Sequence, residues 1–149
     1  MYQKTTNLIL LFLIILIILL GTPYRLIVVK GNSMLPSYKN NQIVLAKKVD
    51  NYKKNDVIVF KSESDFLIKR IVYIGGETVY FYLDKERIFI DNSYSVVDDF
   101  IKQNQGIYLY HLEVPENCYF VVGDNLKHSD DSRRFGWISK EEIVYKVID

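Results

Sequence analysis

Cysteine and histidine are scarce in this chain of 149 residues, and their scarcity excludes several kinds of site. Cys118 is the only cysteine, so no intrachain disulfide can form and no cysteine cluster can hold a metal ion. His111 and His128 are the only histidines, and their spacing does not place them on one helix face as ligands. We therefore expect no metal site and no cofactor.

An excess of charge of either sign is also missing. The chain has 19 Lys and Arg against 18 Asp and Glu, a formal net charge of +1. Domains that bind nucleic acid usually carry a strong positive balance, so no nucleic-acid partner is expected. Glycine- or serine-rich linkers and internal repeats are absent as well, and residues 25–149 are expected to form one domain.

What the chain does have is a long apolar run near its start, from Leu8 to Leu20. The uncharged stretch around it, Thr5 to Tyr24, has 20 residues. As a helix it would span about 30 Å, the thickness of the hydrocarbon core of a bilayer. We predict a single transmembrane helix over residues 8–24, preceded by a cytoplasmic terminus at residues 1–7.

Two other interpretations of this run fit less well. A cleavable signal peptide needs small residues at its cleavage site, and the only alanine is Ala46, far downstream. A buried core helix would show a polar face, which this run lacks. Lys4 lies before the run and Arg25 and Lys30 after it, so the distribution of positive charge barely favours one orientation.

The remainder of the chain is rich in β-branched and aromatic residues, arranged in short runs between turn signals. Short strands at this spacing are typical of an antiparallel β-barrel or sandwich, so a mainly β domain is predicted over residues 25–149. A helical turn is predicted at Asp98–Gln103, and a capping-box pattern predicts a short helix after Ser139. The predicted strands are Gln42–Val49, Asp56–Phe60, Phe66–Ile74, Thr78–Leu83, Arg87–Ile90, Tyr108–Val114, Tyr119–Val122 and Ile143–Ile148.

A serine shortly after the apolar run stands in the hexapeptide from Gly31 to Pro36. Glycine allows unusual backbone angles and proline fixes its own φ, so this stretch would present Ser33 on a stiff, exposed turn. A serine hydroxyl is a weak nucleophile without a base nearby. By itself the motif therefore fits an ordinary turn better than a catalytic site.

Two basic residues, Lys69 and Arg70, interrupt the apolar strand predicted over Phe66–Ile74. Adjacent residues of a strand face opposite ways, so one of the two must point inward or into a groove. Burial disfavours the charged amine and would lower the pKa of Lys69, which would make it a base. The alternative is a solvated lysine that protects a sheet edge.

The densest polar stretch, Gly123 to Gly136, follows another apolar strand. It fits a surface loop in which Asn and Asp form local turns. It fits equally well a buried scaffold, in which Ser129 would hold an amine in place and Asp124 or Asp131 would pair with an arginine.

Together these stretches resemble the type I signal peptidases, in the single-anchor branch typical of Gram-positive bacteria. Each motif alone would be weak evidence, but all occur in the family's order after one apolar segment. The matching residues are Gly31-Asn32-Ser33-Met34-Leu35-Pro36, Lys69-Arg70 with Gly76-Glu77, Gly123-Asp124-Asn125, Ser129, Asp131-Ser132-Arg133 and Gly136.

The resemblance implies a membrane-bound serine endopeptidase. Ser33 would be the nucleophile and Lys69 the general base, a variant of the catalytic triad. Ser129 would orient the amine. The oxyanion would be held by the Ser33 N–H and by a group at position 31, where Gly31 replaces the serine of some relatives.

Support of the site and recognition of the substrate are also implied by the resemblance. Structural support would come from Asp124, Arg70, Asp131 and Arg133, with Asp124 expected to pair with Arg70. Met34 and Ile68 are candidates for walls of a substrate pocket, with core packing as the alternative.

The expected substrates are signal peptides of exported preproteins, with small residues at positions −1 and −3, bound as an extended strand. The other expected partner is the lipid bilayer. The expected location is the cytoplasmic membrane, with a single span and the catalytic domain on the extracytoplasmic face.

Two departures from the family pattern stand beside the polar motif. Leu126 replaces a basic residue that is common there, and His128 replaces a common asparagine. A membrane-tethered β domain that only binds preproteins, and a peptidase specialised for one substrate, remain alternatives. A self-cleaving Ser/Lys repressor would need a DNA-binding helical domain where the apolar run lies.

Overall fold

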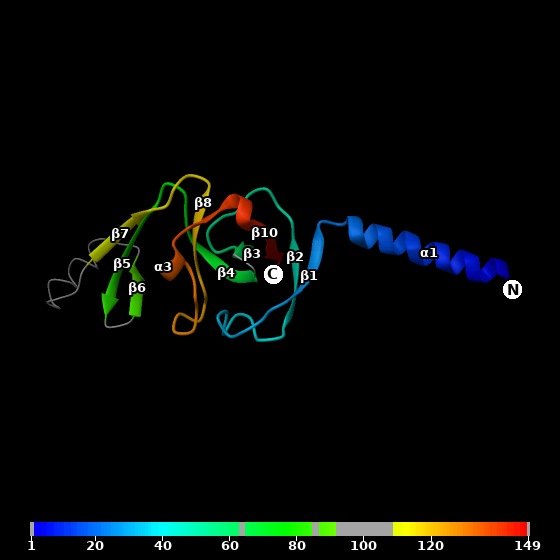
Figure 1. Ribbon diagram of the computed structural model, residues 1–149, viewed down its shortest axis with the longest axis horizontal. Coiled ribbons are helices and arrows are strands. Elements are labelled where there is room, and N and C mark those ends of the chain that lie inside the picture. The colour runs from blue at the N-terminus through cyan, green and yellow to red at the C-terminus, as the bar shows by residue number, and fades with distance from the viewer. Residues whose placement is uncertain (1, 63–64, 85–86, 92–108, 149) are drawn as a thin grey trace.

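The computed structural model describes residues 2–62, 65–84, 87–91 and 109–148. These form a β-rich body with one helix projecting from it (Figure 1). The helical turn predicted at Asp98–Gln103 lies outside the described residues.

The projecting helix, α1, runs from Tyr2 to Gly21. It contains no proline, and its many leucines favour a helix. Pro23, two residues after the last helical position, cannot continue the helical hydrogen bonds. In the part of the chain that the structure describes, no helix is long and apolar enough to cross a membrane. The anchor predicted over residues 8–24 thus stays a prediction, and Tyr24 belongs instead to the first strand, β1.

The body consists of two antiparallel sheets, which confirms the mainly β, antiparallel prediction. Seven strands form the larger sheet in the order β1-β2-β10-β3-β4-β8-β9, and three form the smaller one in the order β6-β5-β7. The strands of the larger sheet are β1 (Tyr24–Val28), β2 (Ile43–Lys47), β3 (Val57–Ser62), β4 (Asp65–Ile74), β8 (Cys118–Val122), β9 (Ile138–Ser139) and β10 (Ile143–Ile148). Those of the smaller sheet are β5 (Thr78–Asp84), β6 (Arg87–Asp91) and β7 (Leu109–Glu113).

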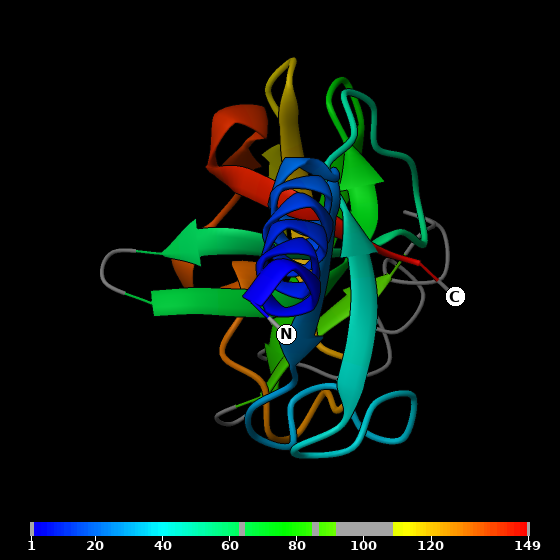
Figure 2. The same ribbon diagram turned by 90° about the vertical axis from the view of Figure 1, so that its right-hand side faces the viewer.

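Strand β3 is the centre of the core because both of its faces are buried. Val57 and Val59 pack in one apolar cluster, and Ile58 and Phe60 pack in another. A strand buried on both faces reads as a continuous apolar run, which is why Asp56–Phe60 is recognisable from sequence. Figure 2 looks along α1 onto the end of the body where β1 and β2 lie.

Two short helices flank β9. The first, α3 (Ser132–Phe135), begins after Asp131, whose side chain caps it, and ends at Gly136 with φ 83°. The second, a single 3₁₀ turn called η1 (Lys140–Glu142), follows Ser139, whose N–H donates to the Glu142 carboxylate at 2.6 Å. The capping box predicted there is therefore confirmed.

Candidate active site

The turn that carries Ser33 connects β1 to β2. Gly31 has φ 82°, a conformation that side chains other than glycine rarely adopt, and its N–H donates to Asn40 Oδ1 at 2.9 Å. Further along, the N–H of Tyr38 donates to the Met34 carbonyl at 2.9 Å, and the Leu35–Pro36 peptide is cis. Ser33 is half-buried in this turn, whereas the sequence predicted an exposed serine.

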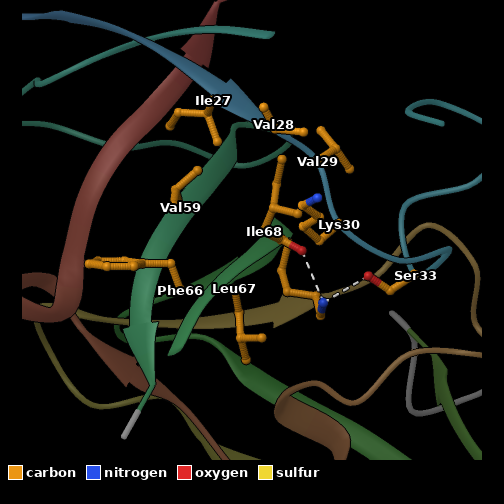
Figure 3. A pocket seen from close by; sticks show the side chains of 10 residues that line it. Ile27, Val28, Val29, Lys30, Ser33, Val59, Phe66, Leu67 and Ile68 are labelled. Carbon is orange, nitrogen blue, oxygen red and sulfur yellow. Dashed lines mark hydrogen bonds between the residues drawn. The ribbon is translucent and has the colours of Figure 1, made fainter. Parts of the chain in front are cut away.

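Lys69 is the residue of the Lys-Arg pair that points inward. Its side chain is only 3% exposed, and its Nζ lies 3.0 Å from Ser33 Oγ. The same Nζ donates to the Ile68 carbonyl at 3.0 Å (Figure 3). Burial lowers the pKa of Lys69, although the carboxylates of Asp131 and Asp130 act in the opposite direction. The amine is thus biased toward the neutral form that can accept a proton.

Arg70 makes a two-point contact with Asp124. Its Nε and Nη2 donate to the two carboxylate oxygens at 2.8 and 2.7 Å, and Nη1 donates to the Asn55 carbonyl at 2.9 Å. Burial raises the pKa of Asp124, but hydrogen bonds from Arg70 and Ser37 outweigh burial and lower it. The expected pairing of Asp124 with Arg70 is confirmed, and it joins β4 to the polar loop after β8.

A second ion pair fixes the other half of that loop. Asp131 is completely buried and accepts hydrogen bonds from Gly123 N–H at 3.0 Å and from Arg133 Nε at 2.8 Å. Ser132 Oγ accepts from the N–H of Val121 at 2.9 Å. The polar stretch is therefore a hydrogen-bonded scaffold against β8, which is the second of the two interpretations of its sequence.

A cavity of about 250 Å³ opens beside Ser33 and Lys69 (Figure 3). Strand β4 pairs with β3 from Asp65 to Arg70, but it pairs with β8 only from Arg70 onward. One edge of β4 therefore has no pairing partner next to the cavity in the described part of the chain. The lining residues are Ile27, Val28, Val29, Lys30, Ser33, Val59, Phe66, Leu67, Ile68 and Lys69.

Comparison with known proteins places the chain in a family. A family model described as "Signal peptidase, peptidase S26" matches residues 2–148. The chain belongs to this family.

Proteins similar to this signal peptidase include two bacterial relatives and a solved structure. Signal peptidase I V of Bacillus subtilis (strain 168) is 31% identical over 140 residues, which cover 81% of this chain and 82% of that protein. Signal peptidase IB of Staphylococcus aureus (strain N315) is 28% identical over 148 residues, covering 85% and 75%. A crystal structure of a signal peptidase I from Enterococcus faecalis V583 is 25% identical, with a TM-score of 0.45, and covers 68% of this chain and 100% of that one.

Ser129 and the Ser33 carbonyl both pack against Gly123, but Ser129 does not make the contact with the Lys69 amine that the sequence predicted. Its Oγ is buried and has no hydrogen-bond partner among the described residues. It lies near enough to the Asp131 carboxylate to help lower the pKa of that group, against the effect of burial. The role of Ser129 in orienting the Lys69 amine stays a prediction.

The two proposed pocket residues differ in position. Ile68 lines the cavity, whereas Met34 is fully buried in the core cluster and is not among the lining residues. Leu126 and His128, the two departures from the family pattern, are exposed.

Sequence reasoning missed the wall formed by Ile27–Lys30, although Gly21 and Pro23 separate these residues from the apolar run. It also gave no role to Asn125, which contacts the Ser33 turn. Its place in the Gly-Asp-Asn motif was the available signal.

We predict that Gly123→Ala inactivates the enzyme. An added Cβ would overlap Ser129 Oγ and lie 2.6 Å from the Ser33 carbonyl oxygen, so the Ser33 turn must shift. A displacement of about 1 Å costs on the order of a hundredfold in rate, which a peptide-cleavage assay would detect. Gly21→Ala is the control, because a Cβ there meets nothing within 4 Å. Equal rates for the two variants would show that the backbone at Gly123 does not constrain Ser33.

Proposed function

We propose that this signal peptidase removes signal peptides from exported preproteins with Ser33 as nucleophile and Lys69 as general base. The observation that carries the proposal is the 3.0 Å contact between Lys69 Nζ and Ser33 Oγ in a buried setting. A neutral amine at this distance can accept the hydroxyl proton as Oγ attacks the scissile carbonyl. The protonated amine then delivers that proton to the leaving amine.

Hydrolysis of the acyl-enzyme repeats the same steps with water. Lys69 takes a proton from water, the hydroxide adds to the ester carbonyl, and the proton returns to Ser33 Oγ as the ester bond breaks. In both halves the negative oxygen would accept from the Ser33 N–H. The Gly31 N–H already donates to Asn40, so it supports the turn.

The substrate would bind as an extended strand along the open edge of β4. A peptide strand pairs its main chain with such an edge and places alternate side chains on one face. Side chains at −1 and −3 would then enter the apolar cavity beside Ser33. Its volume of about 250 Å³ and the wall formed by Ile68 favour small residues at these positions.

We further propose that α1 anchors the enzyme in the cytoplasmic membrane, with the β domain on the extracytoplasmic face. The outer face of β1 and β2, next to α1 in Figure 1, supports this location. Leu26 lies opposite Leu45, and Val28 opposite Ile43. Their exposed fractions run from 42% to 74%. A contiguous exposed apolar patch of this kind marks an interaction surface.

The position of the patch favours lipid as its partner. Only Thr22 and Pro23 separate α1 from β1, so the patch begins at the end of the apolar helix. At its border Lys47 Nζ lies 5.3 Å from the ring centre of Tyr24. Aromatic and basic side chains are enriched at membrane interfaces.

Ser33 and Lys69, the proposed catalytic dyad, predict the effect of two substitutions. We expect wild type to cut a preprotein after the second alanine of Ala-x-Ala, and Ser33→Ala and Lys69→Ala each to lower kcat/KM by a factor of about 100 or more. Lys61→Ala is the matched control, because Lys61 is exposed on β3. Cleavage by both dyad variants at the wild-type rate would refute the mechanism, and an inert wild type would favour a binding module.

The buried amine predicts the pH dependence of the reaction. Protonated Lys69 cannot act as a base, so kcat/KM should rise with pH through its lowered pKa, below the usual lysine range of about 10.4. The exposed Asp130 carboxylate raises the pKa of Lys69, so Asp130→Asn should move the rise to lower pH. Asp50→Asn, a similar change at an exposed site, serves as control. If the pH profile of kcat/KM for Asp130→Asn stays in place or moves to higher pH, the assignment of the rise to Lys69 is wrong.

The patch predicts contact with acyl chains. In vesicles with brominated lipids, a tryptophan introduced by Leu26→Trp in a Trp137→Phe background should be quenched. Wild type is the control, because its single tryptophan, Trp137, is 42% exposed and precedes β9 at the other end of the sheet. Vesicle-bound protein without quenching at position 26 would show that the patch faces water.

A further inference from the structure

Asn125 binds the serine turn at two successive carbonyl groups. Its backbone N–H donates to the Ser33 carbonyl at 2.9 Å, and its side-chain Nδ2 donates to the Asn32 carbonyl at 3.0 Å. The residues are 93 positions apart in the sequence, so the contact joins two separate motifs. The Leu35 N–H is a second, longer donor to the Asn32 oxygen, at 3.3 Å.

The bond to Asn32 bears on catalysis because of peptide geometry. The Asn32 carbonyl and the Ser33 N–H belong to the same planar trans peptide unit, so they point in opposite directions. A donor that fixes the carbonyl therefore fixes the direction of the N–H as well. That N–H is the proposed donor to the oxyanion, where orientation decides how strongly the developing charge is stabilised.

The segment that carries Asn125 is itself held firmly. Asp124 is paired with Arg70 through two hydrogen bonds, and the Gly123 N–H donates to the buried Asp131. The Gly123 backbone also packs so closely on the Ser33 carbonyl that a Cβ would reach 2.6 Å from its oxygen. Asn125 is thus a rigid donor rather than a mobile surface side chain.

We propose that the Asn125 side-chain amide is a positioning residue that aims the Ser33 N–H at the oxyanion. The inference rests on the proposed peptidase function and deepens it. It also gives the asparagine of the Gly-Asp-Asn motif a role distinct from that of Asp124, which binds Arg70. An aspartate of the same shape could not replace it, because a carboxylate accepts hydrogen bonds and would face another acceptor.

The test compares Asn125→Ala and Asn125→Asp with wild type. Loss of one hydrogen bond predicts a fall in kcat of about fivefold to tenfold for Asn125→Ala, with a larger fall for Asn125→Asp. A peptide aldehyde that ends in the −1 residue supplies the second readout. Ser33 Oγ adds to its carbonyl carbon and the hydroxyl proton passes to the carbonyl oxygen, which then lies at the oxyanion position.

Aldehyde affinity should fall by the same factor as kcat, while KM and the pH at which the rate rises stay unchanged. A purely structural defect would instead lower the folded fraction, which thermal unfolding measures. Asn51→Ala is the control, because Asn51 is exposed between β2 and β3. Asn125→Asp preserves the shape of the side chain, so it reports on the role if Asn125→Ala does not fold.

Three outcomes would overturn the role of Asn125. These are unchanged kcat in both variants, lowered kcat with unchanged aldehyde affinity, and an effect on KM alone. Failure of the proposed function is visible separately, because wild type itself would then cleave no preprotein.

Discussion

The contact between a desolvated lysine amine and a serine hydroxyl is the interaction on which the rest of the structure depends. Lysine in water is charged at neutral pH and cannot act as a base. The fold removes Lys69 from water by placing it on β4 beside apolar neighbours, and it brings the amine to 3.0 Å from Ser33 Oγ. Burial of an amine has a cost in stability, and perturbed groups of this kind cluster at functional sites.

The charged groups around Ser33 and Lys69 form two ion pairs of their own. Arg70 pairs with Asp124, and Arg133 pairs with Asp131. Asp131 also raises the pKa of Lys69, against the larger effect of burial. The scaffold thus includes a buried carboxylate, whereas the proposed base would work only when neutral.

The features to which we assign substrate binding and membrane attachment, both proposals, lie at the same end of the molecule. The cavity wall formed by Ile27–Lys30 continues the strand β1, whose opposite end adjoins α1. Leu26 and Val28 face outward while Val29 is buried, as alternation along an extended chain requires. One short segment therefore connects the proposed anchor, the apolar surface and the substrate cavity.

The sequence by itself determined most of the strands and named the residues of the candidate site. Strands such as β3 and β4 are recognisable because burial demands β-branched and aromatic runs, and eight predicted strands are present. The strands β1 and β9 were not predicted: β1 begins only a few residues after the apolar run, within the predicted anchor, and β9 has two residues, too few for a periodic pattern. Ser33, Lys69 and the Asp124–Arg70 pair were named from motif order and residue chemistry.

Only the tertiary structure decided which alternatives apply. The sequence of β4 does not say which of Lys69 and Arg70 points inward, because that depends on which face the neighbouring strands cover. Met34 proved to be a core residue, and the Ser129 hydroxyl lacks its expected contact with the amine. The two bonds from Asn125 to the serine turn join residues 93 positions apart. Local pattern cannot encode such distances and directions, because they arise when segments distant in the chain pack together.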